Sequence, residues 1–197
     1  MDNKLGAIII AGGKSSRMGS DKGMKLLNGK PLIGYALAAV LPICSDVIIS
    51  TNNSEYEQFG FPLVADIHKE IGPLGGLHAA LKASKHQYNL VVSCDAPFVS
   101  TEILKKMTTS GFESCAYLDA QDGIHPLIGY YSKEILMNIE FQVAKENYKM
   151  MDFLEAINCQ LYRPSKALQK QYPNFAFNVN TPESFAEAEK ILNGLSK

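Results

Sequence analysis

The amino-acid sequence predicts a three-layer α/β/α fold built on a mainly parallel sheet. Short apolar runs alternate with helix-period segments almost throughout, and this alternation implies right-handed βαβ crossovers between parallel strands. The 197 residues suit a single domain over 1–197, large enough for a sheet that is covered on both faces. Glycine-rich and polar motifs directly follow several apolar runs, which is where open parallel sheets bind their ligands.

Each predicted strand is a short apolar run bounded by turn residues. Leu5–Ile10 is the first of them and ends in a run of three isoleucines, which predicts a buried strand. Further along the chain, two apolar runs flank the turn Asp119-Ala120-Gln121-Asp122-Gly123, so two strands are expected there. After the first strand, the expected strands in chain order are Val47–Ser50, Leu63–Ala65, Leu90–Ser93, Ser114–Leu118, Leu127–Tyr131, Gln160–Tyr162 and Phe175–Val179.

Helix boundaries follow from capping residues. Pro31 is expected in the first turn of a helix through Leu41, because its missing N–H has no intrahelical partner there anyway. Ser54-Glu55-Tyr56-Glu57 has the spacing of a capping box and predicts a short helix that stops near Gly60. Thr181 as N-cap and Pro182 at the first position predict the C-terminal helix. The other expected helices are Leu74–Lys85, Thr101–Thr109, Lys133–Phe141 and Asn147–Ile157.

The bulk composition excludes several classes of protein. A formal net charge of −1 argues against broad nucleic-acid or anionic-membrane binding, which requires a basic surface. No apolar segment approaches the ~20 residues that span a bilayer, and the N-terminus leads into a strand with no signal-peptide pattern. The 4 cysteines show no C-x-x-C spacing, so reduced thiols are expected. We therefore expect a cytoplasmic protein.

The loop after the first strand has the properties of a polyphosphate site. Gly12 and Gly13 let the backbone approach a phosphate closely, and Arg17 and Lys22 add full positive charges. The loop is not a Walker A motif, because position 8 is isoleucine where that motif needs glycine, and no G-x-G-x-x-G is present.

An aspartate follows another predicted strand directly, in Ser93-Cys94-Asp95-Ala96-Pro97. Phosphoryl and nucleotidyl transfer from a triphosphate both require Mg²⁺, which proteins hold through one or two carboxylates plus phosphate and water. Asp95 suits that role. The alternative is an aspartate that only caps the turn after the strand.

The order A-G-G-x-S-x-R-M-G-x-D-K over residues 11–22 resembles the signature of nucleotidyltransferases with a single Rossmann-like domain. Within that superfamily the sequence looks most like the molybdenum cofactor guanylyltransferases. The resemblance implies GMP transfer from GTP to molybdopterin with release of pyrophosphate, aided by Mg²⁺ at Asp95. It implies Arg17, Lys22 and Asp95 as catalytic residues. It also implies a nucleotide-binding half over about 1–100 and an acceptor-binding half over about 101–197.

The same resemblance implies a nucleotide site around several strand ends. Gly72-Pro73-Leu74-Gly75-Gly76 is similar to the family's G-P-L-x-G segment, and Asp66 matches its nucleotide-binding aspartate. Ser50 stands where relatives often carry an asparagine, and Asn52 is the expected substitute. The implied nucleotide-binding residues are Ile10, Ala11, Gly12, Gly13, Lys22, Ser50, Asn52, Asp66, Gly72, Pro73, Leu74, Gly76 and Asp95.

For the acceptor, His125-Pro126 resembles the family's H-P segment, and residues 178–183 match its terminal N-x-N-T-P-E motif. Asn178 and Asn180 would share one face of the expected strand. Transient contact with other molybdenum cofactor proteins is also implied. Two alternatives stay open: another nucleotidyltransferase, moving CMP to molybdopterin or a nucleotide to a sugar phosphate, and a nucleotide-binding module without turnover.

Overall fold

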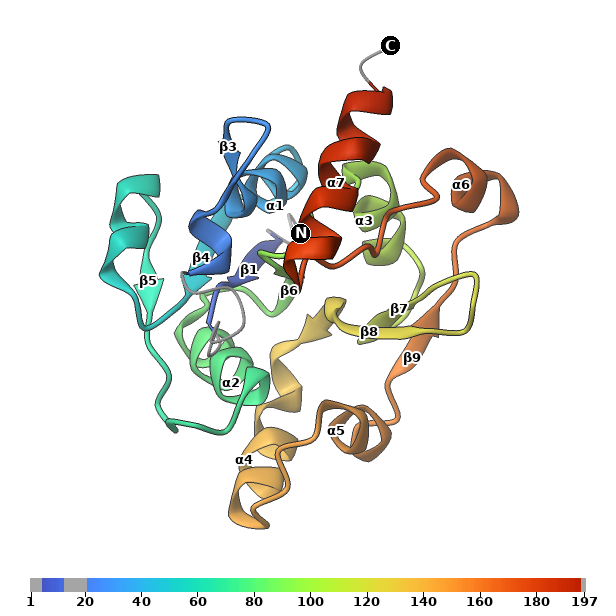
Figure 1. The fold of residues 1–197 in the computed structure, drawn as a ribbon. Helices are drawn as coiled ribbons and strands as arrows, with labels where there is room; N and C mark the ends of the chain where they lie inside the picture. The colour runs from blue at the N-terminus through green and yellow to red at the C-terminus, as the bar shows by residue number, and fades with distance from the viewer. Residues whose placement is uncertain (1–4, 13–20, 196–197) are drawn as a thin grey trace.

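A computed structural model of the chain describes residues 5–12 and 21–195, and its core is a seven-stranded, mainly parallel sheet (Figure 1). The strand order is β5-β4-β1-β6-β8-β7-β9, and only β8 of these runs antiparallel to its neighbours. The strands are β1 (Gly6–Ile10), β4 (Asp46–Ser50), β5 (Leu63–Val64), β6 (Tyr88–Ser93), β7 (Cys115–Leu118), β8 (Ile124–Ser132) and β9 (Gln160–Tyr162). The predicted fold class is confirmed.

Helices cover both faces of the sheet (Figure 1). They are α1 (Leu32–Val40), α2 (Pro73–Ala83), α3 (Thr101–Thr108), α4 (Leu136–Ala144), α5 (Met150–Ala156), α6 (Lys166–Gln171) and α7 (Pro182–Leu195), with 3₁₀ turns η1 (Lys22–Met24), η2 (Ser54–Phe59) and η3 (Lys133–Ile135). A small hairpin, β2 (Leu26–Leu27) with β3 (Lys30–Pro31), precedes α1 and was not predicted. None of the helices among the described residues is long and apolar enough to cross a membrane.

The alternation of side chains along β1 divides the core into two layers. Ile9 faces a cluster with α1 and α3, whereas Ile8 and Ile10 face a cluster with α2, α4 and α5. All three isoleucines are at most 3% exposed. Because β1 is buried on both faces, its sequence is continuously apolar, as expected of a central parallel strand.

The chain moves from β1 outward to β4 and β5, and then crosses back to β6 on the other side of β1. The strand order therefore reverses between β1 and β6, and open parallel sheets bind ligands at the carboxyl ends of the strands at such a point. This topology sets the position of the candidate site.

Three sequence predictions need correction. Phe175–Val179 is not a strand: the Val179 N–H donates one hydrogen bond to the Asp95 carbonyl at 2.8 Å, and no ladder forms. Pro31 lies just before α1 as its N-cap, and not in the first turn. The N-cap of η2 is Asn53, not Ser54, because the Asn53 side chain accepts from the Glu55 N–H at 3.0 Å.

The start of α7 is confirmed: Thr181 Oγ1 accepts from the Ser184 N–H at 3.2 Å, and Pro182 is the first helical residue.

All four cysteines are free thiols, with Cys94 and Cys115 buried. Burial raises the pKa of the Cys115 thiol to about 12, and a neighbouring Cys159 adds to this shift.

Candidate active site

The last residues of four strands lie in register at one edge of the sheet. Ile10 pairs with Ser50 on one side and with Ser93 on the other, and Ser50 pairs with Val64. Two backbone hydrogen bonds extend this alignment beyond the strands, from the Ala11 N–H to the Ser50 carbonyl and from the Cys94 N–H to the Ile10 carbonyl. The polar residues that follow the strands therefore emerge side by side, at the edge where the sequence predicts a ligand site.

Three motifs that are far apart in the sequence meet beside β6. The Lys22 ammonium donates to Asn180 Oδ1 at 2.6 Å and lies 3.9 Å from Asp95 Oδ2. The bond between Val179 and the Asp95 carbonyl holds the segment before α7 against the same turn. One cation, one carboxylate and one amide thus converge at the carboxyl edge.

Asp95 is suited to a divalent cation that is shared with a nucleotide. Its Oδ1 accepts from Ser93 Oγ at 2.6 Å, while its side chain remains 16% exposed beside Lys22. Within the described ranges, no cluster of three or more His, Cys, Asp or Glu residues could hold a metal ion alone. A single carboxylate is sufficient when substrate phosphates and water complete the shell of Mg²⁺.

On the other side of β1, Asn52 and Asp66 hold each other by a reciprocal pair of hydrogen bonds. Asn52 Nδ2 donates to Asp66 Oδ2 at 3.2 Å, and the Asp66 N–H donates to Asn52 Oδ1 at 3.1 Å. Asp66 follows β5 and Asn52 follows β4, so two predicted nucleotide-binding residues form one unit. This unit fixes the orientation of the Asp66 carboxylate.

The start of α2 packs directly against this unit. A Cβ added at Gly76 would lie 2.7 Å from Ser50 Oγ and 3.5 Å from Asp66 Oδ1, so only glycine allows this approach. Gly72 precedes the helix with a φ of 69°, and Pro73 is its first residue. Among the remaining predicted residues of this region, the buried side chains are those of Ile10, Ala11, Ser50 and Leu74.

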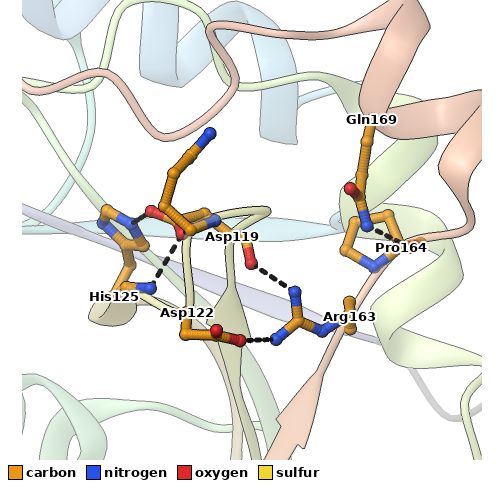
Figure 2. Close-up of polar contacts among 8 residues, drawn as sticks. Asp119, Asp122, His125, Arg163, Pro164 and Gln169 are labelled. Carbon is orange, nitrogen blue, oxygen red and sulfur yellow. Dashed lines mark hydrogen bonds and ion pairs between the residues drawn. The ribbon is translucent and has the colours of Figure 1, made fainter.

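A second polar cluster lies farther along the same edge, around the turn between β7 and β8 (Figure 2). Asp119 lies between His125 and Arg163, which come from β8 and from the end of β9. His125 Nε2 is 2.8 Å from Asp119 Oδ2, while Arg163 donates to the Asp119 carbonyl at 2.7 Å and pairs with the Asp122 carboxylate.

The Asp119 carboxyl is held in its charged form. Partial burial raises its pKa, but hydrogen bonds from His125 and from the N–H groups of Gly123 and Gln121 outweigh this and lower the pKa below its usual value. A carboxylate can only accept, so His125 Nε2 carries a hydrogen and Nδ1 is the remaining polar atom of the ring. The adjacent Pro126 carbonyl accepts from the Tyr131 hydroxyl at 2.7 Å.

Not every predicted residue can be placed. Gly13 and Arg17 lie outside the described residues. Gly12 is exposed beyond β1, and a Cβ added there would lie 4.0 Å from the Ser50 carbonyl oxygen. Asn178 is exposed, as is Asn180, with the buried Val179 between them.

Sequence analysis missed four polar residues that hold the others in place. Asp119 contacts His125 and accepts from Arg163 through its carbonyl, while Asn53 and Tyr56 both donate to Asp21. Asp21 belongs to the glycine-rich motif, so the sequence already pointed to a role for its side chain. Nothing in the sequence pointed to Tyr56, because a capping box concerns only the polar residues around it.

Comparison with known proteins gives a consistent result. A family model described as the MobA-like NTP transferase domain matches residues 7–161. The probable molybdenum cofactor guanylyltransferase of Flavobacterium johnsoniae is 38% identical over 159 residues, covering 80% of this chain and 84% of that protein. The molybdenum cofactor guanylyltransferase of Yersinia pestis is 30% identical over 187 residues, 92% of this chain and 93% of its own length.

Solved structures agree with the fold. The molybdopterin-guanine dinucleotide biosynthesis protein A of Archaeoglobus fulgidus superposes with a TM-score of 0.80 at 25% identity, over 96% of this chain and 99% of that one. The 4-diphosphocytidyl-2C-methyl-D-erythritol synthase of Anaerococcus prevotii gives a TM-score of 0.70 at 14% identity, over 98% and 100% of the two chains. At that identity the second likeness concerns the fold alone.

Proposed function

The chain belongs to the MobA-like NTP transferase family, and on this premise we propose that it transfers GMP from GTP to molybdopterin. The products are molybdopterin guanine dinucleotide and pyrophosphate. The acceptor is the molybdenum-loaded pterin, with the metal as cargo of the substrate.

The observation that carries this proposal is the meeting of Lys22, Asp95 and Asn180 at the carboxyl edge of β1 and β6. A module that only binds a nucleotide needs cations for the triphosphate, but it has less need of a lysine beside a carboxylate suited to a metal. The arrangement concentrates charge at one point, as transfer at a single phosphorus atom requires.

The chemical step needs little beyond orientation and charge. A terminal phosphate oxygen of the pterin attacks the α-phosphorus of GTP, a new P–O bond forms, and the bond to the bridging oxygen of the β-phosphate breaks. Pyrophosphate carries away the electron pair of that bond. The attacking oxygen is already anionic near neutral pH, so no general base is required.

Each group that binds the triphosphate has a proposed position along it. Gly12, Gly13 and Arg17 bind the β- and γ-phosphates, and Lys22 binds the α-phosphate, where negative charge builds in the transition state. Asp95 holds a divalent cation, for which we propose Mg²⁺; when bound, such an ion neutralises charge on the phosphate oxygens. When the nucleotide binds, the Lys22 ammonium would donate to the α-phosphate as well as to Asn180 Oδ1.

The two halves of the chain take the two substrates in this proposal. The half up to about residue 100 binds the nucleotide, with the carboxylate of Asp66 accepting from guanine N1–H and N2–H₂. The half from about 101 binds the acceptor through His125, Pro126, Asn178 and Asn180. The contact between His125 Nε2 and Asp119 supports this part, because it holds the imidazole in one orientation at the turn between β7 and β8.

We also propose a cytoplasmic reaction in which the product passes to other molybdenum cofactor or molybdoenzyme proteins. A label-transfer experiment tests the function directly. GTP labelled at the α-phosphorus should place its label in the pterin dinucleotide, whereas label at the γ-phosphorus should appear in pyrophosphate. Label from the γ-position in the pterin product would mean phosphoryl transfer and would overturn the proposal.

A further inference from the structure

Asp21, the residue before Lys22, is held by three donors from two different segments. Its Oδ1 accepts from the Tyr56 hydroxyl at 2.5 Å and from the Gly23 N–H at 3.0 Å, and its Oδ2 accepts from Asn53 Nδ2 at 3.1 Å. Hydrogen bonds to a charged group are the stronger kind. The backbone next to Lys22 is therefore tied to the segment that follows β4.

Tyr56 reaches Asp21 from inside the core. It belongs to η2, its side chain is 0% exposed, and its ring packs in the same layer as Ile9 and Ile49. Burial, followed by the proximity of Cys94 and the bond to Asp21, raises the pKa of Tyr56 well above its usual value. The hydroxyl therefore stays protonated and donates to the carboxylate.

Gly23, the residue after Lys22, is locked against the same hydroxyl. A Cβ at this position would lie 2.2 Å from the Tyr56 hydroxyl oxygen and 3.2 Å from Cys94 Sγ, so the backbone can pass only as glycine. Lys22 thus stands between two fixed neighbours. We call Asp21, Gly23 and Tyr56 the clamp around Lys22; the Lys22 side chain extends from it toward Asn180 and Asp95.

We propose that Tyr56, acting through the Asp21 carboxylate, is a positioning residue that sets where the Lys22 ammonium lies relative to Asp95. The proposal rests on the proposed function, in which Lys22 serves the α-phosphate. A misplacement of a catalytic group by about 1 Å can lower a rate on the order of 100-fold. The Tyr56 hydroxyl meets the residues on either side of Lys22, Asp21 and Gly23, so its proposed effect on the reaction runs through them.

The test is Tyr56→Phe, which removes one oxygen atom and keeps the buried ring. Tyr35→Phe is the matched control, because the Tyr35 hydroxyl donates at 2.7 Å to the Leu27 carbonyl, away from this network. For Y56F we expect kcat to fall about 10- to 100-fold while the KM for GTP changes much less. For Y35F we expect wild-type kcat.

Two further measurements separate positioning from general destabilisation. Hydrogen exchange of the Gly23 N–H should accelerate in Y56F and not in Y35F, whatever the activity. In a double-mutant cycle, Y56F and Asp21→Asn should be non-additive in kcat, because both act on the same charge-assisted hydrogen bond: the first removes its donor and the second removes the charge of its acceptor. Asn53→Ala removes an outer donor to Asp21 and should give a smaller loss of kcat, with the core tyrosine intact.

Wild-type kcat in Y56F, or additive effects of Y56F and D21N, would overturn the inference. So would unchanged exchange of the Gly23 N–H. A wild-type protein that transfers no GMP in the same assay would instead overturn the proposed function, so the two failures are distinguishable.

Discussion

Removing the charge of Lys22 by Lys22→Ala is expected to lower kcat far more than it weakens GTP binding. At the 3.9 Å that separates its ammonium from Asp95, a unit charge pair is worth about 4 kcal/mol at an effective dielectric of ~20. A phosphate oxygen in the same position would meet a similar field. GTP is already anionic, so only part of that energy is specific to the transition state.

We therefore expect a loss of about 3 kcal/mol in transition-state stabilisation, which is on the order of 10²-fold in kcat. The fold should survive. The substitution removes the hydrogen bond to Asn180 and the partly exposed ion pair with Asp95, each worth about 1 kcal/mol net of desolvation, so the Tm should shift by about 4–8 °C in a chain of this size.

The assay is steady-state pyrophosphate release with GTP and molybdopterin, together with GTP affinity measured by direct titration. Lys25→Ala is the matched control, since it makes the same change in net charge three positions along the chain. A mutant that matches wild-type kcat at saturating GTP and only binds GTP more weakly would refute the reasoning. Lys22 would then be a ground-state binding residue.

Three other substitutions extend the account. Asp95→Asn should lower turnover about 10²-fold or more across a Mg²⁺ titration with little change in Tm, because the isosteric amide lacks the charge that a hard cation needs; normal turnover at low Mg²⁺ would make Asp95 a turn-capping residue. Asp66→Ala should shrink a GTP over CTP preference that we expect to be at least about 100-fold in kcat/KM; an intact ratio would limit Asp66 to the ribose. Burial lowers the pKa of His78 despite the opposing Glu140 carboxylate, so the folded state resists its protonation. Stability should thus fall as pH drops below ~6.5, by at most ~1.4 kcal/mol per pH unit, and His78→Gln should flatten that fall in urea titrations; an unchanged slope would assign it to other groups.

The strands that build the site were predictable because their signals are local. Leu5–Ile10, Val47–Ser50 and Leu90–Ser93 are short apolar runs that end in polar residues, and β1, β4 and β6 lie there within two residues. Once those strands are parallel, their carboxyl ends must share one edge. That Asp95 and the start of the glycine-rich loop lie at that edge therefore follows from topology.

The false strand at Phe175–Val179 has a different cause. Its alternation is real, because Val179 is buried between exposed Asn178 and Asn180. A strand also needs a partner along its length, and β6 offers this segment only the carbonyl of Asp95, beyond its own end. The missed helix α6 shows the converse, since Leu168 is its only buried residue and no apolar periodicity marks it.

The clamp around Lys22 was unpredictable for a third reason. Asp21 and Tyr56 are 35 positions apart, so no local sequence pattern links them. Asn53 and Ser54 are both good N-caps, so sequence alone could not decide which one caps η2 and which side chain faces Asp21. Tertiary packing decides which side chains contact Asp21.

The central claim, guanylyl transfer to a pterin, is tested most directly by pyrophosphate release measured with each of GTP, CTP, ATP and UTP, with and without molybdopterin. We predict release with GTP only when molybdopterin is present, in step with formation of the dinucleotide, and at least about 100-fold lower kcat/KM with the other nucleotides. Comparable release with CTP would contradict guanylyl transfer while leaving the nucleotidyltransferase assignment in place.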